Sequence, residues 1–225
     1  MNGNNDLSKV KFFLRFGKRK YLEDIKRGCL SFCPLNYYRE LEKGRGDNRE
    51  GAIPGIRNAF FYPINLNEIP IYCLFSGYKE DLIEKDGKYV INVSQKKKEV
   101  ILRDFHDSDS VIVIRNPQKF INDIVRSIGT DVESRLVNYA RDDVYIDTSM
   151  MDEKISKNGE KRYVVTTENA KNFAFYKEGY YKMQQEYRVM LPNENISTRK
   201  TYYVNFTDTY DILDIDDLFN SEYVL

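Results

Sequence analysis

Val111-Ile112-Val113-Ile114, the most hydrophobic run of the chain, is followed at once by Arg115-Asn116-Pro117. Four β-branched residues in succession predict a buried strand. Asn116 and Pro117 are typical of the start of a helix. The apolar face of that helix consists of Phe120, Ile121, Ile124, Val125 and Ile128. Gly129 is expected to end the helix. A strand followed directly by an amphipathic helix indicates a mixed α and β fold.

Shorter elements surround this unit. We expect strands at 11–16, 29–33, 71–76, 136–139, 186–191 and 200–206, a helix at 18–27, and an acidic turn or helix at 211–220. Residues 88–93 and 99–105 are predicted as two strands around a lysine-rich, solvated turn at 96–98. Because the alternation of strands and helices is short and irregular, the pattern favours an α+β fold with mixed or antiparallel sheets over a doubly wound parallel sheet.

The length and composition suit a single domain over residues 1–225. The chain has 225 residues, of which 41% are hydrophobic, so it can bury a substantial core. Residues 147–162 are polar and are expected to form a mobile excursion.

Several kinds of function are disfavoured by composition. Lysine plus arginine equals aspartate plus glutamate at 35 each, which gives no general electrostatic case for nucleic-acid binding. Three cysteines without a CxxC pair and a single histidine exclude a structural zinc site, so no metal is expected. No apolar run is long enough to cross a membrane and no signal sequence is visible, which predicts a cytoplasmic protein with free thiols. There is no GxGxxG or GxxxxGK[ST] phosphate loop.

A series of motifs extends over about residues 11–191. It includes the aromatic strand Phe12–Phe16, the segment Tyr37-Tyr38-Arg39, the loop Gly46-Asp47-Asn48-Arg49-Glu50-Gly51, and a late Lys177…Gln184-Gln185-Glu186-Tyr187-Arg188. This order resembles uncharacterised bacterial proteins of the domain-of-unknown-function class. That resemblance implies no established chemistry.

Gln184–Pro192 also resembles a segment of bacterial mono-ADP-ribosyltransferase toxins, which combine an arginine, a serine and a late glutamate. The matching residues are Arg15 in Phe-Leu-Arg-Phe-Gly, Ser76 in Phe-Ser-Gly, and Glu186. The resemblance implies an ADP-ribosyltransferase-like fold with an insertion near 95–170. The chain departs from the family because Ser-Thr-Ser is reduced to Phe75-Ser76-Gly77.

The resemblance to these toxins implies NAD as the substrate. Cleavage of its glycosidic bond builds positive charge on the ribose, which the carboxylate of Glu186 would stabilise. Arg15 would bind the pyrophosphate and Ser76 would orient Glu186. The implied enzyme is an ADP-ribosyltransferase or an NAD glycohydrolase, which suits a toxin, a phage-defence effector or a counter-defence factor.

Further residues are candidates in the same site. Gln184 occupies the position that selects the acceptor in the toxins; here the acceptor is an unidentified protein or nucleic acid. Tyr181 or Tyr187 is a candidate to stack on nicotinamide, and Lys177 to contact a phosphate. Structural interpretations stay open as well: Arg15 as an exposed strand arginine, Lys177 as an exposed lysine, and Glu186 with Arg188 as a surface ion pair.

Two other functions remain open. The first is a non-catalytic nucleotide- or protein-binding module on the same fold, which the reduced Ser-Thr-Ser motif favours. The second is a metal-dependent nuclease that uses Asp47, Glu50 and Asp104 with magnesium, although no DxD or ExK cluster supports it.

Overall fold

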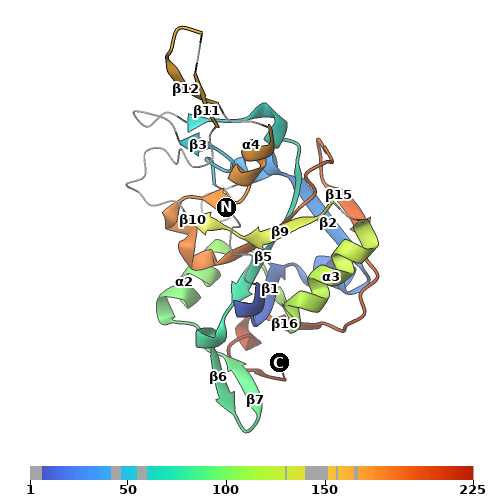
Figure 1. The fold of residues 1–225 in the computed structure, drawn as a ribbon. Coiled ribbons are helices and arrows are strands. Elements are labelled where there is room, and N and C mark those ends of the chain that lie inside the picture. The colour runs from blue at the N-terminus through green and yellow to red at the C-terminus, as the bar shows by residue number, and fades with distance from the viewer. Residues whose placement is uncertain are drawn as a thin grey trace.

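A computed structural model describes residues 7–41, 47–54, 60–129, 131–139, 152–155, 157–164 and 167–224. Its centre is an eight-stranded sheet whose neighbouring strands are all antiparallel. The strands are β1 (Phe12–Gly17), β2 (Cys29–Pro34), β5 (Pro70–Gly77), β8 (Ser110–Ile114), β9 (Glu133–Leu136), β14 (Glu186–Met190), β15 (Lys200–Tyr203) and β16 (Asp211–Asp214). Their order is β15-β2-β5-β1-β8-β16, with β14 also paired to β5 and β9 to β14 (Figure 1).

Four α-helices accompany the sheet within the described ranges: α1 (Arg19–Lys26), α2 (Gln95–Asp104), α3 (Pro117–Ile128) and α4 (Thr167–Phe173). The start of α3 is fixed by Asn116, whose side chain accepts a hydrogen bond from the backbone amide of Lys119. Apolar residues of α1 and α3 pack on one sheet face together with Phe13, Leu74 and Tyr187. The α+β prediction with antiparallel sheets is therefore confirmed.

Smaller pieces complete the fold. The short strands are β3 (Ile53–Pro54) with β4 (Phe60–Phe61), β6 (Leu82–Lys85) with β7 (Lys88–Ile91) and β17 (Glu222–Tyr223), β10 (Asn138–Tyr139) parallel to β13 (Tyr176–Lys177), and β11 (Asp152–Ile155) with β12 (Lys161–Val164). The 3-10 helices are Leu7–Lys9, Leu35–Arg39, Ile64–Leu66, Lys79–Asp81, Gly179–Gln184 and Ile215–Asp217. The β11–β12 hairpin projects from the body (Figure 1) and includes the described part of the excursion expected at 147–162.

Several predicted elements are wrong in whole or in part. Residues 95–104 form helix α2 and not a strand, because the Ser94 side chain accepts from the Lys97 amide and so caps a helix. Lys97 is buried and pairs with Asp81 at 2.5 Å, so the lysine run is not a solvated turn. Of the turn or helix expected at 211–220, residues 211–214 instead extend the sheet beside β8 as β16, and only the part from Ile215 onward is a 3-10 helix and turn. The range 95–170, expected as an insertion, supplies β8, β9 and α3, and therefore belongs to the core.

The sheet has an opening beside β5 that positions the candidate site. One edge of β5 pairs with β14 along its length, whereas the other pairs with β2 only at Pro70–Ile71 and with β1 only at Phe75–Gly77. Tyr72–Leu74 therefore have no strand partner on that edge. We call this opening between β1 and β2 the notch.

Candidate functional site

Four buried charged side chains meet beside β14, and we call them the charged centre: Glu50, Lys177, Glu186 and Arg188. Glu186 and Arg188 share a face because side chains two apart on a strand point the same way. Lys177 Nζ donates to Glu186 Oε2 at 2.9 Å, and Arg188 Nε donates to Glu186 Oε1 at 2.7 Å. Arg188 Nη1 donates to Glu50 Oε1 at 2.7 Å, and Lys177 Nζ lies 3.9 Å from Glu50 Oε2. The surface ion pair considered for Glu186 and Arg188 is thus a buried one.

A tight loop brings Glu50 to this centre. Gly51 has a φ of +66°, and a Cβ there would meet the Leu35 side chain, so only glycine suits the turn. The Glu50 carbonyl accepts from Arg39 Nε at 2.7 Å. Asp47 is also buried, and its carboxylate accepts from the Arg49 amide at 2.9 Å and from the Glu178 amide at 3.3 Å. The loop is therefore held by structural contacts on both sides.

Burial and charge act in opposite directions on the two carboxyls. Burial raises the pKa of Glu186, but the charges of Arg188 and Lys177 outweigh it and hold this pKa well below its usual range. For Glu50, burial outweighs Arg188 and Lys177, so its pKa is raised. Burial lowers the pKa of Lys177, but the charges of Glu186 and Glu50 raise it by more, so the pKa is raised overall. Glu186 is thus ionised, and it is bound at both oxygens.

Polar contacts extend the charged centre toward α2. Gln184 Oε1 accepts from Lys177 Nζ at 3.0 Å, and Gln184 Nε2 donates to Asp104 Oδ2 at 2.9 Å. The ring of Tyr181 lies 4.7 Å from Lys177 Nζ, measured to its centroid. The structure therefore brings Lys177, Tyr181, Gln184 and Glu186 together, as the sequence predicted.

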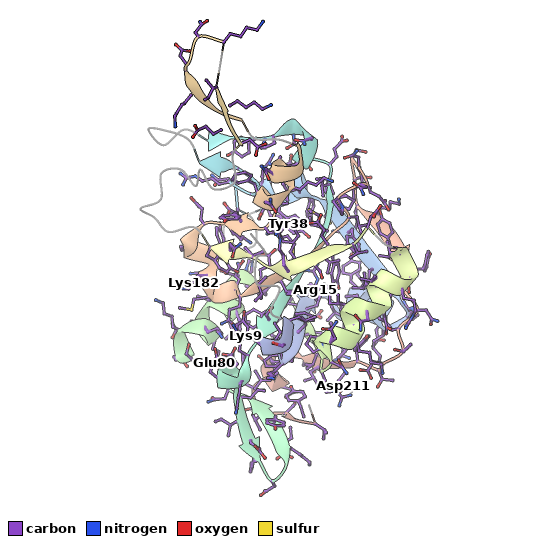
Figure 2. The ribbon with its side chains drawn as sticks, in the orientation of Figure 1. Lys9, Arg15, Tyr38, Glu80, Lys182 and Asp211 are labelled. Carbon is purple, nitrogen blue, oxygen red and sulfur yellow. The ribbon has the colours of Figure 1, made fainter. Side chains whose placement is uncertain are left out.

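The second part of the site is the notch, where Arg15 spans the opening. Arg15 Nη1 donates to the Cys73 carbonyl at 2.8 Å, and its guanidinium lies 5.1 Å from the centroid of the Tyr72 ring. Arg15 and Tyr38 are labelled in Figure 2. Arg15 forms no ion pair with any carboxylate of the described residues, so a charge beside the sheet lacks a counter-ion there. It is partly buried, not an exposed strand arginine.

A pocket of about 110 Å³, the notch pocket, connects the two parts. Arg15 and Arg199 line it, as do Lys177, Gln184 and Glu186 at the edge of the charged centre. Arg199 also has no carboxylate partner in the part of the chain that the structure describes; its Nη2 lies 3.5 Å from the hydroxyl of Tyr37. The remaining lining is largely aromatic and apolar: Leu14, Phe16, Tyr37, Tyr38, Leu41, Leu74, Phe75 and Phe105, with Cys33 and Cys73.

Ser76 does not join the site. Residues directly opposite one another in an antiparallel pair share a face. Ser76 lies opposite Phe13, whereas Glu186 lies opposite Phe75, the neighbour of Ser76, so Ser76 and Glu186 are on opposite faces. The Ser76 hydroxyl is buried and has no hydrogen-bond partner in the described structure. The expected contact in which Ser76 orients Glu186 is therefore wrong, because strand alternation sends the two side chains apart.

The sequence interpretation missed the roles of Arg199 and of Glu50 as ion-pair partner. Arg199 follows a polar loop with no signal beyond its charge. Glu50 was considered only as a turn residue or a magnesium ligand. The only sign in the sequence that Glu50 lies near Glu186 and Arg188 was that the Gly-Asp-x-x-Glu-Gly loop and the late Lys…Gln-x-Glu-Tyr-Arg motif belong to the same series of motifs.

The arrangement does not suit the magnesium nuclease. Glu50 is paired with Arg188, and Asp104 accepts from Arg103 Nε at 2.7 Å as well as from Gln184. Among the described residues, no group of three or more histidine, cysteine, aspartate or glutamate side chains is placed to hold a metal ion.

Comparison with models of known protein families, with the curated proteins and with the solved structures found no match for this chain. No helix in the described ranges has the length and apolar character needed to cross a bilayer.

Proposed function

We propose that this chain binds a nucleotide in the notch pocket. The observation that carries the proposal is the pair of arginines, Arg15 and Arg199, which line one pocket without a carboxylate partner among the described residues. Arg15 is partly buried and Arg199 is exposed. A phosphate would supply the counter-ion that the partly buried guanidinium of Arg15 lacks, and would accept paired hydrogen bonds from it. Lys177 and Glu186 also line the pocket, but their charges are already paired, so the two arginines supply its unbalanced charge.

The rest of the pocket suits a nucleobase. Phe16 and Phe105 are stacked with their centroids 4.5 Å apart, and both line the pocket. Aromatic faces bind bases by stacking, with about 1–3 kcal/mol per base. A pocket of about 110 Å³ holds one such group and not a whole dinucleotide. A binding module is therefore the function that the geometry supports best.

Calorimetric titration with ADP and UDP tests this proposal. We expect binding by the wild type and at least about tenfold weaker binding by Arg15→Met, because one charge-assisted phosphate contact contributes roughly 1.5–3 kcal/mol. Arg126→Met is the matched control, since Arg126 is exposed, pairs with Asp123, and is absent from the notch pocket lining. No binding by the wild type, or equal binding by Arg15→Met, contradicts the proposal.

The second candidate is cleavage of NAD, as an ADP-ribosyltransferase or glycohydrolase. One observation favours it: Glu186 and Gln184 line the same pocket as Arg15. Two observations count against it: both oxygens of Glu186 are occupied, and strand alternation places both Arg15 and Ser76 on the sheet face opposite Glu186. Incubation with NAD distinguishes the two candidates, because an enzyme releases nicotinamide and a binding module does not. Release that is lost in both Arg15→Met and Glu186→Gln, with each variant folded by circular dichroism, would favour the enzyme.

A further inference from the structure

A second cavity, of about 190 Å³, borders the notch pocket beneath α1, and we call it the α1 pocket. Its walls include Leu22, Ile25 and Tyr72, which belong to the core cluster on the face opposite Glu186. The two cavities share four lining residues: Arg15, Phe16, Cys33 and Arg199. Both arginines therefore stand where the cavities adjoin.

The α1 pocket adds polar side chains of both kinds beyond the two shared arginines. The donor Lys18, the acceptors Asp24 and Asp107, and the hydroxyls of Ser31 and Ser108 all line it. Hydroxyl groups both donate and accept hydrogen bonds, as a ribose does with an acidic residue in dinucleotide-binding folds. The part of a ligand that enters the α1 pocket should therefore be rich in hydroxyl groups.

We infer that the ligand is a nucleoside diphosphate joined to a sugar. The base occupies the notch pocket, the phosphates lie at Arg15 and Arg199, and the sugar enters the α1 pocket. Together the cavities enclose about 300 Å³, the lower end of the range for small-molecule sites. This inference rests on the proposed nucleotide binding and adds the class of ligand to it.

The test compares each diphosphate with its sugar conjugate by calorimetry: ADP with ADP-ribose, and UDP with UDP-glucose. For at least one pair we expect the conjugate to bind about tenfold more tightly, since two or three added hydrogen bonds suffice for that factor. Ser31→Tyr fills the α1 pocket with a side chain that strands accept. It should remove the advantage of the conjugate and leave the affinity for the diphosphate unchanged.

Thr209→Tyr is the matched control, because Thr209 is exposed and is absent from the linings of both cavities. This control variant should still bind the sugar conjugate more tightly than the diphosphate. Thermal unfolding checks the fold of both variants, and Asp24→Asn replaces Ser31→Tyr if that variant does not fold, with an expected loss of about threefold or more of the advantage.

Each outcome decides the inference. Equal affinity for diphosphate and conjugate in both pairs overturns it while nucleotide binding stands. An advantage that survives Ser31→Tyr or, in its place, Asp24→Asn also overturns it, because the sugar then lies elsewhere. Absence of binding by all four compounds overturns the proposed function and this inference together.

Discussion

The charged centre and the notch both hold cationic side chains, but only in the charged centre are the charges balanced. In the charged centre two acids face two bases, and Arg188 reaches both Glu50 and Glu186 within 2.7 Å. In the notch, the partly buried Arg15 and the exposed Arg199 have no carboxylate partner among the described residues. The difference teaches that buried charge alone does not identify a binding site. A balanced cluster is explained by the fold, whereas the unbalanced one is where the proposed nucleotide would bind.

The largest effect is expected in the charged centre. Arg188→Leu leaves Glu50 and Glu186 without their shared cation, so unfolding in urea should show a loss of about 3–5 kcal/mol. Arg27→Leu removes an exposed arginine that pairs with Asp24 and should change stability little. A small loss in Arg188→Leu would contradict the idea that the charged centre is structural.

A second effect concerns pH and Glu186. The pKa of Glu186 is lowered in the folded state. Its contribution to the free energy of unfolding is therefore present above the unfolded pKa of about 4.3 and is lost as the pH falls toward the folded pKa. Glu186→Gln should therefore be less stable than the wild type by about 3 kcal/mol at pH 7, and this difference should narrow below about pH 5. Urea unfolding at a series of pH values measures it.

Glu50 should show the opposite trend. The pKa of Glu50 is raised in the folded state. Its contribution to the free energy of unfolding is therefore present below the unfolded pKa and is lost as the pH rises through the folded pKa. The stability of Glu50→Gln relative to the wild type should therefore improve with rising pH. The same urea series measures this, and parallel profiles for the two glutamine variants would show that the two carboxyls are not distinct.

A smaller effect is expected in the notch without ligand. Arg15→Met removes the hydrogen bond to the Cys73 carbonyl but leaves no carboxylate of the described structure unpaired, so the free energy of unfolding should fall by about 1–2 kcal/mol, less than in Arg188→Leu. A loss as large as that of Arg188→Leu would mean that Arg15 is a structural residue, and the contrast between the two regions would fail.

The smallest effect is expected at Ser76. Its hydroxyl is buried and has no partner in the described structure, so Ser76→Ala should change stability by about 1 kcal/mol or less, toward greater stability. Ser134→Ala is the comparison, because the Ser134 hydroxyl accepts from the hydroxyl of Tyr187 at 3.0 Å, and its loss should cost about 1 kcal/mol. A marked loss of stability in Ser76→Ala would show that its hydroxyl has a partner.

Local signals located most strands. The apolar runs at 71–76, 111–114 and 186–191 correspond to β5, β8 and β14. A strand that is buried on both faces is apolar along its length whichever strands it pairs with, so its own sequence reveals it. The helix at 95–104 was missed although Ser94 is a local capping signal. The burial of Lys97 depends in addition on Asp81, which no periodicity within 95–104 reveals.

The sequence by itself determined the α+β class with mixed or antiparallel sheets, and the group formed by Lys177, Tyr181, Gln184 and Glu186, since these residues lie within ten positions of one another. Only the tertiary structure decided that the central sheet is antiparallel, that Ser76 faces away from Glu186, that Glu50 completes the charged centre, and that Arg15 and Arg199 line one pocket. The reason is physical: side-chain periodicity is a local property of the chain, whereas the register between strands, and the divergence of β1 from β2, arise only when distant segments pack together.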